Sequence, residues 1–138
     1  MLSMSTYPEE YIAECRSRVD SDVTAYKRLA AAAGAAAGAF APVFFNNMVI
    51  VLDAYFCHRA RTLEGKDGNP LNEVRLLCSS LMLHDGVMTA EKSIKLSPDS
   101  SVLKLRFGDT IALDEADFSR LSAAFFAELE SRFSKQAA

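Results

Sequence analysis

One stretch of the sequence, residues 43–61, most constrains how this chain can fold. At helical spacing, its first four turns carry apolar residues on almost every side. A helix that is apolar all round lies inside a protein or a membrane rather than on a surface. We therefore expect a central helix here. Its polar residues Asn46, Asn47 and Asp53 should then be buried and need hydrogen-bonding or ionic partners.

The uncharged run that leads into this stretch is long enough to suggest a membrane span. Residues 29–45 carry no charge, and five more apolar residues follow the Asn pair. Length alone would allow a transmembrane helix. However, the run is rich in Ala and Gly, Pro42 interrupts it, and Asp53 would be costly in lipid. We expect a core helix and no membrane partner.

Composition indicates one globular domain. The chain has 138 residues, of which 50% are hydrophobic and 24% charged, which suits a single hydrophobic core. A net charge of −3 argues against a nucleic-acid partner, which would need a basic face. The three cysteines show no C-x-x-C spacing and favour free thiols in a reducing compartment. The N-terminus lacks the basic segment followed by an apolar run that marks a signal peptide, so we expect a cytoplasmic protein.

Apolar residues at helical spacing predict four helices, at about residues 8–33, 42–63, 70–84 and 114–133. Pro42 is expected to begin the second helix, because proline disrupts a helix interior. Asn69 followed by Pro70 is typical of a helix start, and Asp114 opens a capping signature for the last helix. We expect residues 1–138 to form a mainly α, four-helix bundle-like single domain.

A change of period after Gly86 predicts β structure. Leu103–Phe107 and Thr110–Leu113 alternate apolar and polar residues around the turn pair Gly108-Asp109. We expect a small β-hairpin at about residues 102–113, before the last helix. Two strands are marginal alone, so the hairpin should lie on the helices.

Gly34 and Gly38, four residues apart, predict a close approach of another backbone on one helix face. That approach could come from another helix of the same chain or from a second copy in a dimer. The alternative interpretation is a ligand that approaches the backbone at these glycines.

The sequence does not contain the spacing of familiar catalytic or cofactor sites. His58, His84 and the scattered cysteines lack zinc-like spacing, so we expect no metal. No glycine-rich phosphate loop or G-x-S-x-G elbow is present, and we expect no cofactor. Cys57 and His58 are sequence neighbours, which point about 100° apart on a helix and do not face each other, so we expect a buried Cys57 thiol rather than a Cys–His dyad.

The connection between the second and third helices is the candidate site. Its short length makes these helices antiparallel neighbours and joins the basic end of one to the polar start of the other. The candidate ligand-binding residues are Asp53, His58, Arg59, Arg61, Lys66, Asn69, Asn72, Glu73 and Arg75. Positive side chains beside a helix N-terminus could bind a small anion such as phosphate.

Structural roles are the alternative for the same residues. Arg61 and Arg75 could pair with Glu64 and Glu73, while the two asparagines cap the third helix. For Asp53, Arg75 or a tyrosine hydroxyl of the first helix is the expected partner. That pairing would either fix helix register as a buried ion pair or mark a general base with a perturbed pKa.

The block from Glu64 to Arg75, EGKDGNPLNEVR, resembles a segment of small uncharacterised bacterial proteins. The resemblance implies no activity and carries no functional residue to this chain. A helical RNase of the HEPN type would show Arg followed a few residues later by His on one helix. Here His58 precedes Arg59 and Arg61, so that signature is absent.

Two functional hypotheses follow from these observations. The first is a homodimeric interaction module that associates through its Ala/Gly-rich or aromatic helix faces. The alternative is a small-molecule or anion-binding protein, which could be an enzyme, with its site at the junction of the second and third helices.

Overall fold

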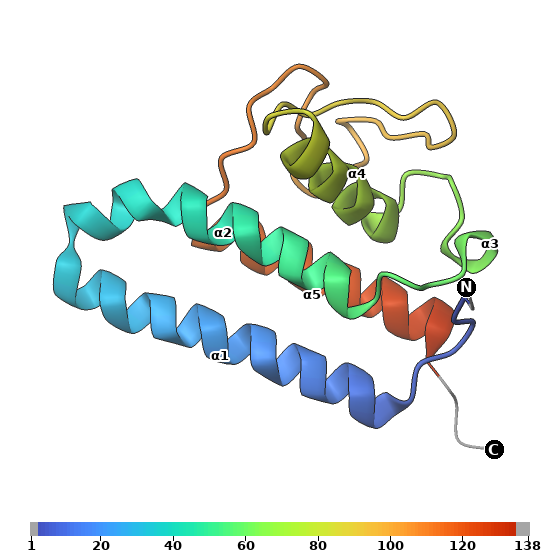
Figure 1. Cartoon of the computed structure of the whole chain (residues 1–138), viewed down its shortest axis with the longest axis horizontal. Helices are drawn as coiled ribbons and strands as arrows, with labels where there is room; N and C mark the ends of the chain where they lie inside the picture. Colours follow the sequence, from blue (N-terminus) through green and yellow to red (C-terminus); the bar gives the residue numbers. More distant parts are fainter. Residues whose placement is uncertain (1–2, 135–138) are drawn as a thin grey trace.

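The structure is a computed structural model that describes residues 3–134, and it is mainly helical (Figure 1). Its helices are α1 (Glu9–Ala33), α2 (Ala35–Tyr55), α3 (Arg61–Glu64), α4 (Pro70–Leu83) and α5 (Glu115–Phe133). In Figure 1, α1 and α2 lie side by side as an antiparallel pair, and α4 lies on the other side of α2. The prediction of a mainly α protein is confirmed.

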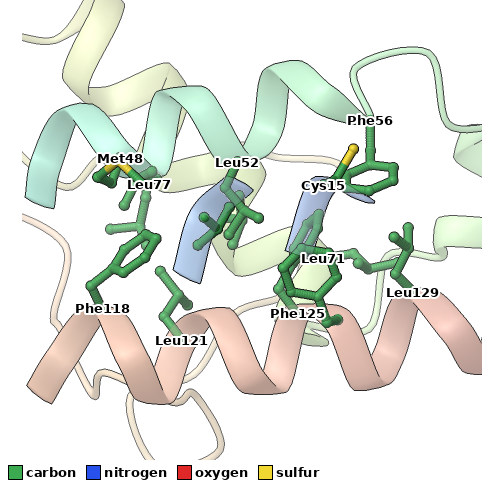
Figure 2. Close-up of a cluster of buried hydrophobic side chains, with 14 of the residues drawn as sticks. Cys15, Met48, Leu52, Phe56, Leu71, Leu77, Phe118, Leu121, Phe125 and Leu129 are labelled. Carbon is green, nitrogen blue, oxygen red and sulfur yellow. The ribbon is translucent and has the colours of Figure 1, made fainter. Parts of the chain in front are cut away.

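Helix α2 is the centre of the fold, as its apolar sequence predicts. It packs against α1, α4 and α5. Phe45, Val49 and Leu52 are fully buried on its inward side. Figure 2 shows Phe118, Leu121 and other side chains of α5 pointing toward α2 across this core. Burying each Leu or Phe contributes about 1.5–3 kcal/mol, so this interface supplies much of the stability.

The predicted start of the second helix at residue 42 is wrong. Helix α2 begins at Ala35, and Gly34, with φ of 60°, forms the break between α1 and α2. Alanine is the strongest helix former, so Ala35 to Ala41 remain helical. Pro42 lies inside α2, where it removes one backbone hydrogen bond without ending the helix.

The predicted end of that helix at residue 63 is also wrong. Helix α2 ends at Tyr55, and the separate short helix α3 follows. Phe56 leaves helical geometry with φ of −131° and ψ of 30°, and its ring is buried. The N-terminal segment holds the turn that follows, because Met4 N donates to His58 O at 2.7 Å and Ala60 N to Met4 O at 2.8 Å. Pairing with this segment replaces helical bonding.

No β-hairpin forms at residues 102–113, so that prediction is wrong. The segment between α4 and α5 is irregular, with one isolated bridge between Val87 and Thr110. Lys104 has φ of 56°, which breaks an extended strand. Leu103 and Leu105 still pack against the core, so the apolar residues are used without strand pairing. Figure 1 shows this segment passing around α4.

Within the single chain, Gly38 does not serve the close helix packing that its spacing with Gly34 suggests. A Cβ added at Gly38 would meet nothing within 4 Å among the described residues. The neighbouring small residues Ala37 and Ala41 are buried instead, and the Tyr26 hydroxyl donates to Ala37 O at 3.0 Å. Packing at the α1–α2 turn therefore uses alanine and an aromatic ring.

Asn46 connects α2 to the segment that precedes α5. Its side-chain Nδ2 donates to Ile111 O at 2.9 Å, and its Oδ1 accepts from Leu113 N at 3.1 Å. Ile111 and Leu113 are buried, so this amide satisfies backbone groups that lie away from water. Asn47, predicted to be buried as well, is exposed, because it lies on the side of α2 that faces away from the core.

Replacing Asn46 with Ala should lower the free energy of unfolding by about 2 kcal/mol, because two buried backbone groups lose their partners. Urea unfolding monitored by circular dichroism measures this loss. Thr110→Ala, at an exposed position of the same segment, is the control and should change stability by less than about 0.5 kcal/mol. Equal effects of the two substitutions would contradict the proposed role of Asn46.

Candidate functional site

The junction between α2 and α4 contains a buried cluster of charges centred on Glu64. This carboxylate is fully buried and accepts three hydrogen bonds from Arg75. Nε donates to Oε1 at 3.1 Å and to Oε2 at 2.9 Å, and Nη2 donates to Oε1 at 2.6 Å. Arg59, also fully buried, places Nε 2.8 Å from Glu64 Oε1. One carboxylate thus contacts two guanidinium groups.

Asp53 completes the cluster from α2. Its Oδ1 lies 3.0 Å from Arg59 Nη1. Its partner is therefore Arg59, and not Arg75 or a tyrosine as expected. The Arg59 contacts to both carboxylates are ion pairs without hydrogen-bond geometry. Arg59 instead donates hydrogen bonds to the carbonyl oxygens of Phe56 and Leu71, each at 3.1 Å.

The two asparagines at the start of α4 organise the loop around Glu64. Asn72 is fully buried, and its Nδ2 donates to Glu64 Oε2 and to Gly65 O, both at 2.9 Å. Its Oδ1 accepts from Gly68 N at 2.9 Å. Asn69 caps α4, since its Oδ1 accepts from Leu71 N at 2.8 Å. The predicted cap is confirmed, and Asn72 in addition joins the charge cluster.

Glu73 lies apart from the cluster and binds the irregular segment. Its two carboxylate oxygens accept from Val102 N at 2.8 Å and Leu103 N at 3.0 Å. Burial raises the pKa of Glu73 above its ordinary value, although these two hydrogen bonds oppose the shift. Glu73 therefore holds a backbone turn and does not face the arginines.

The three remaining candidate residues lie at the surface. His58, Arg61 and Lys66 are exposed. Five of the nine candidate residues therefore lie together around Glu64. They are Asp53, Arg59, Asn69, Asn72 and Arg75. The structure does not bring the exposed cations into that group.

Electrostatic balance within the cluster determines what it can do chemically. Arg59 and Arg75 carry two positive charges, and Asp53 and Glu64 carry two negative ones. Burial alone would raise the pKa of Glu64, but the hydrogen bond from Arg75 and the charges of both arginines hold it below its ordinary value. Glu64 therefore stays ionised near neutral pH and suits a structural ion pair better than proton transfer.

The candidate residues predicted from the sequence do not include the central residue, Glu64. The sequence indicates Glu64 only as a possible ion-pair partner of an arginine. The signal that could have identified it is the concentration of Arg59, Arg75 and Asn72 around one short connection. Those side chains need a buried acceptor once they leave water.

Acid should unfold the protein partly through Glu64. A carboxylate whose pKa is lowered by folding stabilises the native state above its unfolded pKa, and that stability is lost as pH falls through the folded pKa. We expect the free energy of unfolding to decline below about pH 4, near the ordinary glutamate pKa. Glu73, whose pKa is raised, acts in the opposite direction and favours the folded state as it becomes protonated.

Urea titrations from pH 7 to about pH 3 in steps measure the acid effect, over the range where glutamate protonates. The Glu64→Gln variant is the control, because it lacks the titrating group and should show a shallower decline. An equally steep decline in this variant would assign acid sensitivity to other carboxylates, such as the exposed Asp67, whose pKa is lowered by the hydrogen bond from Asn69.

His58 lies in the wall of an apolar pocket at the end of α2. The pocket has a volume of about 420 Å³. Its lining residues come from the N-terminal segment, α1 and the end of α2, and include Tyr7, Tyr11, Tyr55 and Cys57. The Tyr11 hydroxyl donates to the backbone carbonyl oxygen of Tyr55 at 2.6 Å, which fixes the Tyr11 ring against the end of α2. None of the four charged residues of the cluster around Glu64 lines this pocket.

A second surface feature is the outward face of α2, opposite its buried side. Its members recur at spacings of three and four residues and carry no charge; they are Ala36, Phe40, Val43, Asn47, Ile50 and Ala54. Phe40 and Val43 are 43% and 55% exposed, and Ile50 is partly exposed. We call these six residues the α2 stripe.

Helix α2 is also long and apolar enough to cross a membrane, by length and composition alone. About a third of its most apolar window, 33%, is buried inside the structure. The rest of that window is not buried, so much of the apolar surface of this helix lies outside the core.

Comparisons with protein-family models, with curated proteins and with solved structures found no match.

Proposed function

We propose that this chain is a homodimeric interaction module that associates through the α2 stripe. In this proposal, the long helices form a bundle-like body that holds α2 rigidly and presents its outward face. The junction cluster around Glu64 fixes the end of that helix and is structural. The exposed apolar face of α2 is the observation that carries the proposal.

The spacing and chemistry of the stripe support a helix partner. Residues that recur at three and four positions line one side of a helix and fit the same pattern on a facing helix. Large exposed apolar faces are uncommon on monomers and mark interaction sites. From Ala36 to Ala54 the stripe extends about 27 Å, at about 1.5 Å per residue.

The area of the stripe suits only a small contact with a second copy of the chain. A face about 27 Å long and 10 Å wide on each copy has a planar area of about 270 Å², or about 540 Å² for two copies, which is below the area of a stable interface and in the range of weak, transient contacts. A two-fold dimer needs one patch that matches itself, and an uncharged stripe brings no like charges together. We therefore expect a reversible dimer.

Replacing Val43 with Glu should abolish the dimer, because two-fold symmetry would bury two carboxylates in an apolar contact. Sedimentation velocity of the full chain should show wild type at about twice the chain mass at about 100 μM, well above a micromolar dissociation constant. The variant should sediment as a monomer with an unchanged circular dichroism spectrum.

Leu83→Glu is the matched control. Leu83 is 75% exposed at the end of α4, so this change also replaces an exposed apolar residue with a carboxylate. It should leave the dimer intact. A wild type that stays monomeric would overturn the proposal. If such a monomer bound phosphatidylcholine–phosphatidylserine vesicles and Val43→Glu did not, the stripe would be a lipid-binding surface instead.

A further inference from the structure

We infer that the apolar pocket at the end of α2 binds a small aromatic ligand that carries a carbonyl oxygen, and that the Tyr7 hydroxyl donates a hydrogen bond to this oxygen. The inference does not depend on the dimer proposed for the α2 stripe. It follows from the size and lining of the pocket and from the state of the Tyr7 hydroxyl.

The pocket has the size and lining of a small-molecule site. Its volume of about 420 Å³ lies within the range of about 300–1,000 Å³ that is typical of ligand pockets. Its walls include Tyr7, Tyr11 and Tyr55, together with the apolar residues Met4 and Pro8. Aromatic walls favour an aromatic ligand, because stacked and edge-to-face ring pairs gain free energy beyond that of area burial.

Contacts within the chain hold part of this wall in place. The rings of Tyr7 and Tyr11 stack with their centroids 5.9 Å apart, and both rings meet Phe56 nearly edge-on. Tyr7 N also donates to Phe133 O at 2.7 Å, which attaches the N-terminal segment to the end of α5. A wall that is already ordered reduces the conformational entropy lost when a ligand binds.

The Tyr7 hydroxyl is the observation that points to a ligand. Tyr7 is 5% exposed, and its hydroxyl oxygen is buried and has no hydrogen-bond partner among residues 3–134. The hydroxyls of Tyr11 and Tyr26, by contrast, donate to backbone carbonyl oxygens. Buried hydroxyl groups are normally paired, because an unpaired one has lost its hydrogen bonds to water without replacement. Tyr7 therefore presents an unused donor in the wall of the pocket.

The surroundings of this hydroxyl favour an uncharged acceptor. Burial raises the pKa of Tyr7 to about 12, so the hydroxyl keeps its proton near neutral pH and acts as a donor. The positive charge of Arg59 opposes this shift more strongly than Asp53 adds to it, and a positive charge nearby favours the partial negative charge of a carbonyl oxygen. Among the residues that the structure describes, no carboxylate lines the pocket, so a cationic ligand would lack a counter-charge.

Cys57 allows binding at this pocket to be measured in the unmodified chain. Its thiol, predicted from the sequence to be buried, is instead exposed and lines the pocket, because α2 ends at Tyr55 and no longer sets its direction. Cys15 and Cys78 are buried, so an alkylating reagent should react first at Cys57. A ligand in the pocket should cover this thiol and slow its alkylation.

The probe is the aromatic ketone 2-acetylnaphthalene, and the matched ligand is 2-ethylnaphthalene, which has a similar shape and no acceptor. Alkylation of Cys57 by iodoacetamide in the full chain is followed by mass spectrometry as each ligand is added, which gives its dissociation constant. We expect the ketone to slow alkylation saturably. Tyr7→Phe should raise the dissociation constant of the ketone about two- to tenfold, the range for one neutral hydrogen bond, and leave that of the hydrocarbon unchanged.

Tyr26→Phe is the matched control variant. Tyr26 is also buried, but its hydroxyl donates to Ala37 O at 3.0 Å, and the residue does not line this pocket. This variant should lower the midpoint of urea unfolding and bind both ligands as the wild type does. Tyr7→Phe should not lower the midpoint, because the Tyr7 hydroxyl has no internal hydrogen bond to lose.

Each of three results would overturn the inference. If the ketone does not slow alkylation of Cys57, the pocket does not bind this class of ligand. If Tyr7→Phe weakens both ligands equally, Tyr7 contributes only the packing of its ring. If Tyr7→Phe lowers the unfolding midpoint, the hydroxyl has a partner within the chain, such as Asp53. None of these results tests the α2 stripe, so the proposed dimer is judged separately by sedimentation.

Discussion

Replacing Glu64 with Gln should lower the free energy of unfolding by about 3–5 kcal/mol, the range for breaking a buried ion pair by removing one partner. The carboxylate is fully buried and contacts both Arg59 and Arg75. Gln keeps the shape of the side chain and removes its charge, so the two guanidinium groups would lose the carboxylate that they share. Urea unfolding at pH 7 measures the loss.

A double-mutant cycle tests whether this loss is electrostatic. Arg75→Met removes one positive charge, and together with Glu64→Gln it leaves Arg59 and Asp53 as a balanced pair. The double variant should lose less stability than the sum of the single variants, by about 1–3 kcal/mol. Strict additivity, or a loss below about 1 kcal/mol in Glu64→Gln alone, would contradict a charge cluster that stabilises the junction.

Replacing Gly68 with Ala should lower the free energy of unfolding by about 3 kcal/mol, through backbone strain and a steric clash together. Gly68 has φ of 88°, which disfavours any residue with a Cβ. A Cβ at this position would lie 2.2 Å from Lys95 O, a backbone atom of the irregular segment. Because Lys95 N also donates to Lys66 O at 2.9 Å, the two loops cannot separate without losing this hydrogen bond.

Gly108→Ala is the matched control for Gly68→Ala. Gly108 has φ of 98°, but a Cβ there would meet nothing within 4 Å. This variant should show only the backbone strain, about 1–2 kcal/mol. Thermal and urea unfolding of both variants give the difference, which measures the close approach of the two loops. Equal losses would show that the contact between Gly68 and Lys95 does not affect stability.

Local sequence signals predicted the helices where capping and periodicity agreed. Asn69 and Pro70 start α4 as expected, and the Asp114–Asp117 capping box starts α5. These signals act within one helical turn, so they need no knowledge of the fold. The same reasoning failed at Pro42, where the surrounding alanines and the core contacts of α2 outweigh the missing hydrogen bond.

The prediction of a β-hairpin is wrong for a different reason. Alternating apolar residues show that a segment has a buried side, but strand pairing also requires extended backbone in register with a neighbour. The backbone of Lys104 has the left-handed conformation. The N–H groups of Val102 and Leu103 bind the Glu73 carboxylate instead of another strand. Glu73 lies about thirty residues earlier in the chain, so no local pattern reveals this contact.

The sequence by itself determined the helical class, the central position of α2 and the helix starts at Asn69 and Asp114, because periodicity and capping are local properties. Only the tertiary structure decided that Glu64 joins Arg59, Arg75 and Asp53 into one cluster. It also decided that Asn46 turns inward and Asn47 outward. These choices depend on which elements meet in space, and burial of charge or amide groups has a defined partner only after the helices pack.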